Sequence, residues 1–247
     1  MTSSPRVVVI TGGAGGIGRS LASAFLAEGD AVVLADLPGE RLDAAGTDLG
    51  VATAGVDLTD PGAAASVVAQ VAETHGAIGV LVNNAGILHL HGSVVDLPVA
   101  DFEATVRVNV LGTFAMTQAV ARHMIDAGSR GAIVNISSIG GRQPTPGMGA
   151  YESSKAAVDA ITRWAAIELA ASGIRVNAVA PGPVDTPMMR AGMPDGSPMR
   201  EAWLSRIPLR QMADPDQVAA AAVFLASGRA AHITGTSLPV DGGQLLL

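Results

Sequence analysis

The chain has one tyrosine, Tyr151, and one lysine, Lys155, which stand four positions apart. Residues at this spacing lie on one face of a helix, so the two side chains should be neighbours. A free phenol has a pKa of about 10 and is a poor acid–base catalyst near neutral pH, but an adjacent ammonium stabilises the phenolate and lowers that pKa. All the other Lys and Arg positions hold arginine, which would serve equally well on a surface. The pair therefore predicts proton transfer by Tyr151, assisted by Lys155.

A serine hydroxyl is the next candidate for this chemistry. Ser138 stands thirteen residues before Tyr151 and directly follows the apolar, β-branched run 132–137. Such a hydroxyl can polarise a substrate oxygen while the tyrosine exchanges a proton with it. Ser137 is its neighbour and the weaker candidate for the same role. The combination predicts chemistry at an alcohol or carbonyl oxygen.

A glycine-rich turn at residues 11–18 closes the first apolar run and opens a helical segment. Glycines at such a turn let the backbone approach a pyrophosphate closely, and the N-terminus of the following helix favours the negative charge. The turn predicts dinucleotide contacts from Gly12, Gly16, Ile17 and Gly18. A plain turn between a strand and a helix is the alternative, and the acidic residue after the second strand weakens it.

That acidic residue is Asp36, which follows the apolar run 31–35. A carboxylate there accepts hydrogen bonds from the adenosine ribose of NAD and repels the 2′-phosphate of NADP. The glycine-rich turn contains no basic residue, since the first one after it is Arg19. Asp36 therefore predicts NAD as the cofactor; a solvated carboxylate in a turn is the alternative.

These residues need a scaffold that brings them to one place, and the pattern of the chain predicts an α/β fold. Short β-branched runs alternate with longer Ala- and Leu-rich stretches, as in βαβ units on a parallel sheet. The run Val7 to Ile10 has no polar alternation, so its strand should be covered on both faces. We expect one doubly wound domain with a mostly parallel, seven-stranded sheet. Its strands are predicted at 6–11, 31–35, 51–56, 80–83, 132–137, 174–180 and 237–240, and its helices at 16–28, 62–75, 101–127, 150–172 and 214–227.

One stretch, residues 181–208, breaks this rhythm with prolines, glycines and methionines. We interpret it as an insertion over the strand ends, with a mobile substrate lid at about 183–208. Methionine and tryptophan facing inward would make an apolar pocket, whereas inward arginine would indicate an anionic substrate. We favour the apolar version, because charged side chains prefer water. The residues concerned are Met188, Met189, Met193, Met199, Trp203, Leu204, Arg190, Arg200 and Arg206.

The composition excludes several classes of function. A net charge of −7 with no basic tract opposes nucleic-acid binding. The absence of cysteine removes disulfides, thiol nucleophiles and Cys-ligated zinc. His89 and His91 lack a third ligand at metal spacing, so we expect loop histidines and no metal site. The sequence has neither a secretory signal nor an apolar run long enough to span a bilayer, and a cytoplasmic protein with no membrane contact is expected.

Taken together, these motifs resemble the short-chain dehydrogenase/reductase family in its shorter form, over essentially the whole chain. The matching positions, in order, are Thr11 to Gly18, Asp57, Asn83 to Gly86, Asn109, Ser138, Tyr151 with Lys155, and Pro181 with Gly182. The resemblance implies a Rossmann fold, and the family spacing to tyrosine selects Ser138 over Ser137.

The same resemblance assigns roles to further residues. Asp57 and Leu58 would flank the adenine, and Asn83, Ala85 and Gly86 would lie under the adenosine. Asn109 would use its side chain to hold a water in a proton relay with Lys155. The nicotinamide would be faced by four residues, Pro181, Gly182, Val184 and Thr186.

We therefore expect an NAD-dependent oxidoreductase that moves a hydride between nicotinamide and a secondary alcohol or ketone carbon. A 3-oxoacyl thioester reductase is the alternative within the enzymes. A binding module that senses NAD without turnover is a remote alternative, since it need not retain all four of Asn109, Ser138, Tyr151 and Lys155. The Ala-rich surfaces of helices 101–127 and 150–172, exposed Trp164 and the apolar end 245–247 predict a homo-oligomer, a homotetramer as in similar family members.

Overall fold

A single parallel sheet forms the centre of the molecule. The computed structural model describes residues 5–88 and 91–247. Within them seven strands lie in the order β3-β2-β1-β4-β5-β6-β7, and every neighbouring pair is parallel. The strands are β1 (Val7–Thr11), β2 (Ala31–Asp36), β3 (Ala52–Gly55), β4 (Ile78–Asn83), β5 (Gly131–Ile136), β6 (Ile174–Pro181) and β7 (Ser237–Val240). The predicted α/β class, strand number and doubly wound sheet are confirmed.

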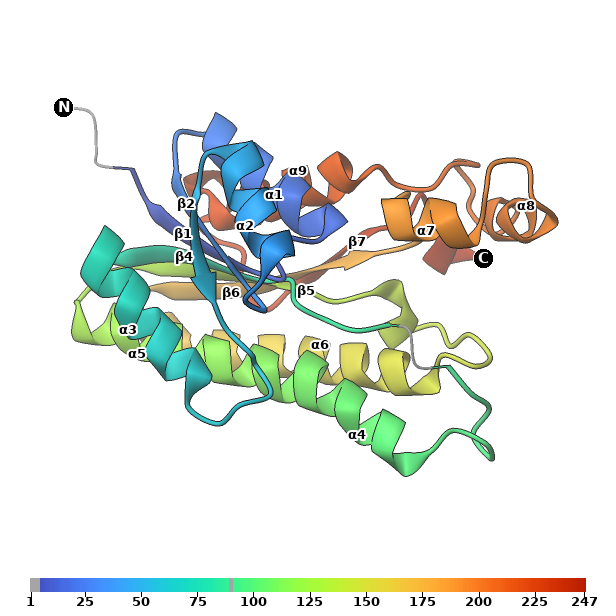
Figure 1. Cartoon of the computed structure of the whole chain (residues 1–247), viewed down its shortest axis with the longest axis horizontal. Coiled ribbons are helices and arrows are strands. Elements are labelled where there is room, and N and C mark those ends of the chain that lie inside the picture. Colours follow the sequence, from blue (N-terminus) through green and yellow to red (C-terminus); the bar gives the residue numbers. More distant parts are fainter. Residues whose placement is uncertain (1–4, 89–90) are drawn as a thin grey trace.

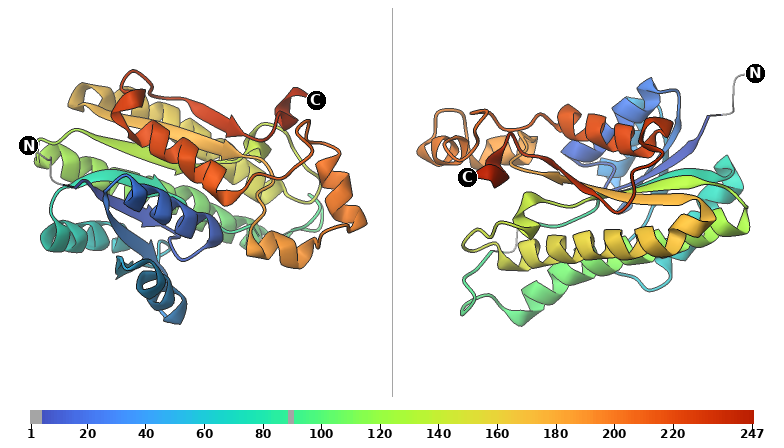
Figure 2. Two further views of the ribbon diagram at one scale, coloured as in Figure 1. Left: turned by 90° about the horizontal axis from the view of Figure 1, so that it is seen from above. Right: turned by 180° about the vertical axis from the view of Figure 1, so that it is seen from behind.

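Helices cover both faces of this sheet (Figure 1). One face carries α1 (Gly16–Ala27), α2 (Glu40–Leu49) and α9 (Pro215–Ala226); the other carries α3 (Ala63–His75), α4 (Val99–Val106), α5 (Thr113–Asp126) and α6 (Gly149–Leu169). The helices α7 (Pro187–Gly192) and α8 (Pro198–Leu204) lie beyond the end of the sheet, as Figure 2 also shows. None of the helices described is long and apolar enough to cross a membrane.

The strands are apolar on both faces because each face has its own core. Alternate residues of β1 divide between them: Val8 and Ile10 pack toward Leu21 and Phe25 of α1, in the cluster that also holds α9. Val7 and Val9 belong to the opposite cluster with α3, α5 and α6. Side chains alternate across a strand, so a strand buried on both faces must be apolar throughout.

Two helical stretches differ from the sequence expectation. The helix α2 was not predicted; it buries only Leu42, Ala45 and Gly46, so its sequence has a weak apolar stripe. The expected helix 101–127 is divided by a π-helix, Arg107–Gly112, between α4 and α5. Hydrophobic periodicity carries no signal for one widened turn, and such turns are frequent at functional sites.

The stretch interpreted as an insertion is partly helical. Thr186 caps α7 by accepting from the N–H of Met189, and Ser197 caps α8 by accepting from the N–H of Arg200. In each case proline follows at the first helical position, where its missing N–H costs nothing. The sequence therefore contained the signal for both helices.

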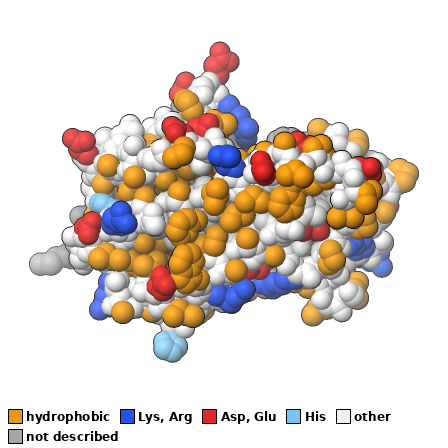
Figure 3. Space-filling model, turned by 90° about the horizontal axis from the view of Figure 1, so that it is seen from below, with side chains coloured by type: hydrophobic (Ala, Val, Ile, Leu, Met, Phe, Trp, Pro, Cys, Tyr) orange, Lys and Arg blue, Asp and Glu red, His pale blue; other side chains and the backbone are white. Residues whose placement is uncertain are grey.

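The face of the molecule formed by α4, α5 and α6 is rich in exposed apolar side chains (Figure 3). Trp164 and Ile167 of α6 are 49% and 80% exposed, and Leu111 and Ile125 are about half exposed as well. Apolar side chains gathered on a helical face with no cover indicate a contact surface.

Candidate active site

The switch in strand order between β1 and β4 brings two loops together at the carboxyl edge of the sheet. The hydroxyl of Thr11 accepts from the backbone N–H groups of Asn84 (3.0 Å) and Ala85 (3.1 Å). The side-chain amide of Asn84 donates to the carbonyls of Thr11 (3.1 Å) and Gly12 (2.9 Å). The glycine-rich turn and the segment 84–86 thus form one unit at the position where doubly wound sheets bind dinucleotides.

The glycine-rich turn has the geometry that a pyrophosphate requires. Gly12 has a φ of +62°, and a Cβ there would lie 2.8 Å from Cα of Ala85. A Cβ on Gly18 would overlap the carbonyl oxygen of Gly12. The first turn of α1 has no side-chain cap and no acidic residue, so its N–H groups can bind an anion. These residues fit a dinucleotide cofactor.

Asp36 lies at the end of β2, beside this turn. Its Oδ2 accepts from the N–H of Ala14 (3.0 Å) and its Oδ1 from the N–H of Leu37 (2.8 Å). Each carboxylate oxygen has a second lone pair, which remains for a further donor such as a ribose hydroxyl. The structure therefore brings the predicted acidic residue to the predicted turn.

The residues implied to surround the adenosine follow two different strands: Asp57 and Leu58 come after β3, and Asn83 ends β4. Hydrogen bonds from the N–H (2.9 Å) and hydroxyl (2.7 Å) of Thr59 hold the pKa of Asp57 below its usual value. Leu58 packs against Gly112 of the π-helix, so closely that a Cβ added to Gly112 would lie 3.0 Å from the Cβ of Leu58. The side chain of Asn83 points into the core instead and donates to Thr117 (3.0 Å) and Asn135 (2.9 Å). The Oδ1 of Asn83 is buried with no hydrogen-bond partner among the described residues.

Tyr151 and Lys155 are neighbours on α6, as their spacing predicts. The ammonium nitrogen of Lys155 lies 5.5 Å from the centroid of the Tyr151 ring and donates to the carbonyl of Ile136 (2.7 Å). The side chain of Ser138 hydrogen-bonds with that of Tyr151 and accepts from the N–H of Gly140 (3.1 Å). Ser137 is buried and donates to the carbonyl of Lys155 (3.1 Å), so its hydroxyl is committed to the backbone of α6.

Burial dominates the ionisation of this pair. It raises the pKa of Tyr151 to about 12, although the hydrogen bond with Ser138 acts in the lowering direction. Burial also lowers the pKa of Lys155 to about 8, although the charge of Asp159 raises it. The net shift of the Tyr151 pKa in the chain by itself is therefore upward, opposite to the lowered pKa that the sequence predicts, because burial outweighs the lowering interactions. Both shifts favour neutral forms, because a buried site penalises charge of either sign.

Asn109 lies in the π-helix and is fully buried. Its side-chain amide donates to the carbonyl of Ile87 (3.0 Å) and the hydroxyl of Ser154 (2.9 Å), and its oxygen accepts from the N–H of Ile87 (2.8 Å). Both amide hydrogens are thus used, and only one acceptor position of the oxygen remains. The implied relay water stays a prediction. The observed side chain fixes the segment after β4 against α6.

The end of β6 leads from this site into the lid segment. The hydroxyl of Ser138 lies 3.5 Å from the carbonyl of Pro181, to which it donates, and Gly182 allows close approach of the backbone of Asp241. Val184 is buried in the core. Thr186 lies against the glycine-rich turn, since a Cβ on Gly16 would be 3.5 Å from it.

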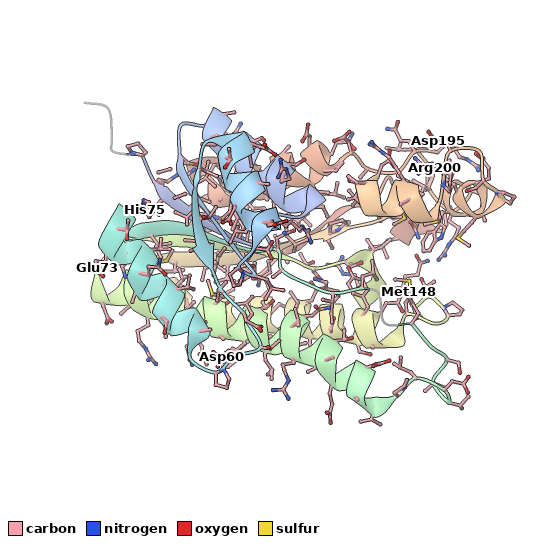
Figure 4. The ribbon with its side chains drawn as sticks, in the orientation of Figure 1. Asp60, Glu73, His75, Met148, Asp195 and Arg200 are labelled. Atoms are coloured by element: carbon pink, nitrogen blue, oxygen red, sulfur yellow. The ribbon has the colours of Figure 1, made fainter. Side chains whose placement is uncertain are left out.

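Arg200 corrects the expectation that the arginines of the lid face water. Its side chain is only 11% exposed and forms ion pairs with Asp185 (3.1 Å) and Asp195 (3.0 Å). Figure 4 shows Asp195 and Arg200 side by side, at the same end of the molecule as Met148. Arg190 pairs with Asp185 as well (3.1 Å), and Arg206 stacks over the ring of Trp203 (4.9 Å). The charges of Arg190 and Arg200 are thus matched by acidic side chains within the lid itself.

Two charged residues near the site were missed by sequence reasoning. Asp159 is buried on α6 one turn after Lys155, and Arg142 lies 3.6 Å from it. The spacing of Asp159 from Lys155 was a usable signal, because it equals the spacing of Lys155 from Tyr151. The position of Arg142 was not predictable, since it depends on the packing of the loop after β5.

Of the two loop histidines, one lies within the described residues. His89 lies outside the described residues, and His91 is exposed. In the part of the chain that the structure describes, no group of three His, Cys, Asp or Glu side chains could hold a metal ion.

Comparison with known proteins agrees with the fold. A family model described as enoyl-(acyl carrier protein) reductase matches residues 12–244. The chain is 40% identical over 246 residues to a 3-oxoacyl-[acyl-carrier-protein] reductase of Thermotoga maritima, covering 98% of each protein. It spans 44% of the length of another curated relative, an uncharacterized short-chain type dehydrogenase/reductase of Sinorhizobium fredii, with 41% identity.

Solved structures of related proteins have the same fold. An NAD⁺-bound xylitol dehydrogenase superposes with a TM-score of 0.90 at 32% identity, covering 96% of this chain and 98% of that one. The protein ElxO with NADP bound superposes with a TM-score of 0.92 at 32% identity, covering 98% of this chain and all of that one. The fold and site define a nicotinamide dinucleotide-binding α/β protein. The chain belongs to the short-chain dehydrogenase/reductase family.

The single tyrosine makes the shift of its pKa directly measurable. An ordinary phenol is half ionised at pH 10, whereas Tyr151, with its pKa raised to about 12, should remain protonated there. In the chain without nucleotide, absorbance near 295 nm should therefore show almost no phenolate at pH 10. The Tyr151→Phe variant supplies the baseline. A half-ionised signal at pH 10 in the folded protein would contradict the burial argument.

Proposed function

We propose that the protein is an NAD-dependent oxidoreductase that interconverts a secondary alcohol and a ketone. The convergence of Ser138, Tyr151 and Lys155 beside the glycine-rich turn carries this proposal. A dehydrogenase needs a proton-transfer group and a hydride carrier within reach of one carbon–oxygen bond. The residues Ser138, Tyr151 and Lys155 supply the proton-transfer group, and the glycine-rich turn fits a dinucleotide that would carry the hydride. The proposal treats the chain as one catalytic domain with a lid at about 183–208.

The residues divide the reaction between them. In the oxidation direction, the phenolate of Tyr151 accepts the hydroxyl proton of the alcohol, and Ser138 donates a hydrogen bond to the same oxygen. The glycine-rich turn would hold NAD, which would supply the acceptor for the hydride of the carbinol carbon. Lys155 stabilises the phenolate by its charge, and Asn109 holds the backbone beside it. Reduction follows the same route in reverse, with Tyr151 donating the proton.

NAD is proposed over NADP because of Asp36. Its carboxylate lies beside the glycine-rich turn, and a 2′-phosphate at that place would meet a like charge. The related structures contain NAD⁺ in one case and NADP in another, so the argument rests on Asp36.

An uncharged substrate fits the lid best. An inward arginine would indicate an anionic group on the substrate, but Arg200 and Arg190 are matched by acidic side chains of the lid. A 3-oxoacyl thioester reductase is the second candidate, favoured by the 40% identity to the Thermotoga maritima reductase. Secondary alcohols, steroids, polyols and 3-hydroxyacyl thioesters, tested with NAD at alkaline pH by NADH absorbance, would separate the two.

We also propose that the chain forms a homo-oligomer, a homotetramer, with α5 and α6 at one of its interfaces. A groove of about 280 Å³ lies between these helices, with the rings of Phe114 and Trp164 stacked beside it at 5.7 Å. With Ile167 and Ile125, these side chains form a partly exposed apolar face that a second copy of the same helix pair would bury.

Tyr151→Phe should lower kcat by at least about a hundredfold, the range expected for a lost general acid–base group. The ring remains, so NADH affinity by fluorescence titration should change little. Lys155→Arg should also lose most activity, because guanidinium has a different shape and reach from ammonium. A Tyr151→Phe enzyme that retained a tenth of the wild-type kcat would refute the proposed role.

Asp36 should favour NAD over NADP by at least about tenfold in kcat/KM. Asp36→Asn is the sharpest test, because it removes the charge but can still accept from Ala14. Asp36→Asn should reduce the ratio of kcat/KM for NAD over NADP while the hydrogen bond to the glycine-rich turn remains. Asp36→Arg should reverse that ratio. Equal kcat/KM values for both cofactors in the wild type would rule out this assignment.

Ile167→Asp should dissociate the oligomer, because it places a charge in the proposed apolar contact. Light scattering at micromolar concentration should give a mass near a tetramer for the wild type and a smaller one for the variant. Val94→Asp is the control, since Val94 is 99% exposed on the loop before α4. A monomeric wild-type protein would contradict the proposal.

A further inference from the structure

Asp159 is a buried carboxylate that the proposed chemistry does not use. It is 5% exposed and lies on α6, one turn after Lys155. Its Oδ2 is 3.6 Å from Nε of Arg142, while its Oδ1 is buried with no hydrogen-bond partner in the described structure. An ionised carboxylate in such a place is costly unless a positive charge compensates it.

Two positive charges lie near this carboxylate. Lys155 precedes it by four residues on the same face of α6, a spacing at which side chains are neighbours. Arg142 approaches from the loop after β5, and its guanidinium also donates to the carbonyl of Ser237 in β7 (2.8 Å). Arg142 is partly exposed, with 36% of its side chain accessible, whereas Lys155 is buried. Because Lys155 and Asp159 are both buried, the charge of one acts on the other with little screening by water.

Other charged groups around Lys155 have different partners or positions. On α6 itself, Glu152 directs both carboxylate oxygens to the N–H of Thr145 (2.9 Å each), and Tyr151 is neutral at ordinary pH. The strand β5 carries no titratable side chain, and Arg175 of β6 donates to the carbonyls of Leu225 and Ser227. The remaining charged residues on α6 are Arg163 and Glu168, and those on the helical segments packed against it are Asp101, Glu103, Arg107, Arg122, His123 and Asp126. The negative charge of Asp159 raises the pKa of Lys155.

We propose that Asp159 is a positioning residue that keeps Lys155 in its ammonium form, and that Arg142 sets how much of the carboxylate charge the lysine experiences. For its consequence in catalysis, this inference rests on the proposed function. An uncharged amine would no longer stabilise the phenolate of Tyr151. Arg142, Asp159 and Lys155 would thus form a row of three interacting charges that extends from β7 to the acid–base pair.

The two partners have opposite effects on Lys155. Burial lowers the pKa of Lys155 to about 8, and the negative charge of Asp159 raises it. Replacing Asp159 by Asn removes that charge, so Lys155 should lose its proton at lower pH. Replacing Arg142 by Gln leaves the carboxylate uncompensated, so Lys155 should keep its proton to higher pH. Loss of structure alone does not predict shifts of opposite sign.

The single lysine permits a test without any substrate. Protein labelled with [ε-¹³C]lysine has one lysine Cε resonance, and its titration reports the pKa of Lys155 directly. Asp159→Asn should lower that pKa by about one unit or more, as expected for loss of a nearby opposite charge, and Arg142→Gln should raise it. Asp159→Glu, which keeps the charge, should stay near the wild type. Asp126→Asn, an exposed carboxylate at the end of α5, is the matched control and should shift nothing.

The outcomes separate this inference from the proposed function. An unchanged titration in Asp159→Asn, or a downward shift in both Asp159→Asn and Arg142→Gln, would overturn the inference even if the enzyme is active. If the Lys155 pKa shifts in opposite directions in the two variants but Tyr151→Phe keeps its activity, the proposed function is wrong. The proposed influence of Asp159 and Arg142 on Lys155 is then still supported. Where activity is found, the alkaline limb of kcat/KM should move to lower pH in Asp159→Asn and to higher pH in Arg142→Gln.

Discussion

The parallel pairing of β1 with β4 is the constraint on which the site depends. Because the chain crosses to opposite faces after these two strands, the turn after β1 and the loop after β4 meet at an open edge with no helix between them. Glycine at position 12 permits that contact, since a side chain there would collide with Ala85. The dinucleotide turn, the π-helix that follows and the acid–base residues of α6 are all located relative to this junction.

Burial then decides the electrostatics. Lys155 is buried and Tyr151 is partly buried, and desolvation makes the phenol resist losing its proton and the ammonium resist keeping it. The pair by itself is therefore closer to neutral than two isolated side chains would be. Charges that favour the ionised forms must therefore come from other parts of the protein or from bound molecules. Within the chain, we propose that Asp159, with Arg142 beside it, supplies such a charge for Lys155.

Buried charge also occurs in the lid, where ion pairs compensate it. Arg200 is nearly buried, but Asp185 and Asp195 match its charge, and the arginines hold the pKa of Asp185 below its usual value against the raising effect of burial. A lid whose ion pairs are internal can carry apolar side chains toward a substrate without presenting a net charge to it. This arrangement supports the proposal of an uncharged alcohol or ketone substrate, in a family whose members differ in substrate.

The sequence by itself determined the α/β class, the seven strands and the pairing of Tyr151 with Lys155. These follow from local rules: apolar runs on doubly covered strands, glycines at a turn and a helical spacing of four. Only the tertiary structure showed the π-helix under Asn109, the inward side chain of Asn83, the buried Arg200 and the approach of Arg142 to Asp159. Each depends on a partner distant in sequence or on one widened turn, and neither periodicity nor composition specifies such contacts. The direction of the Tyr151 pKa shift belongs with them, because burial is a property of the folded chain and not of the spacing.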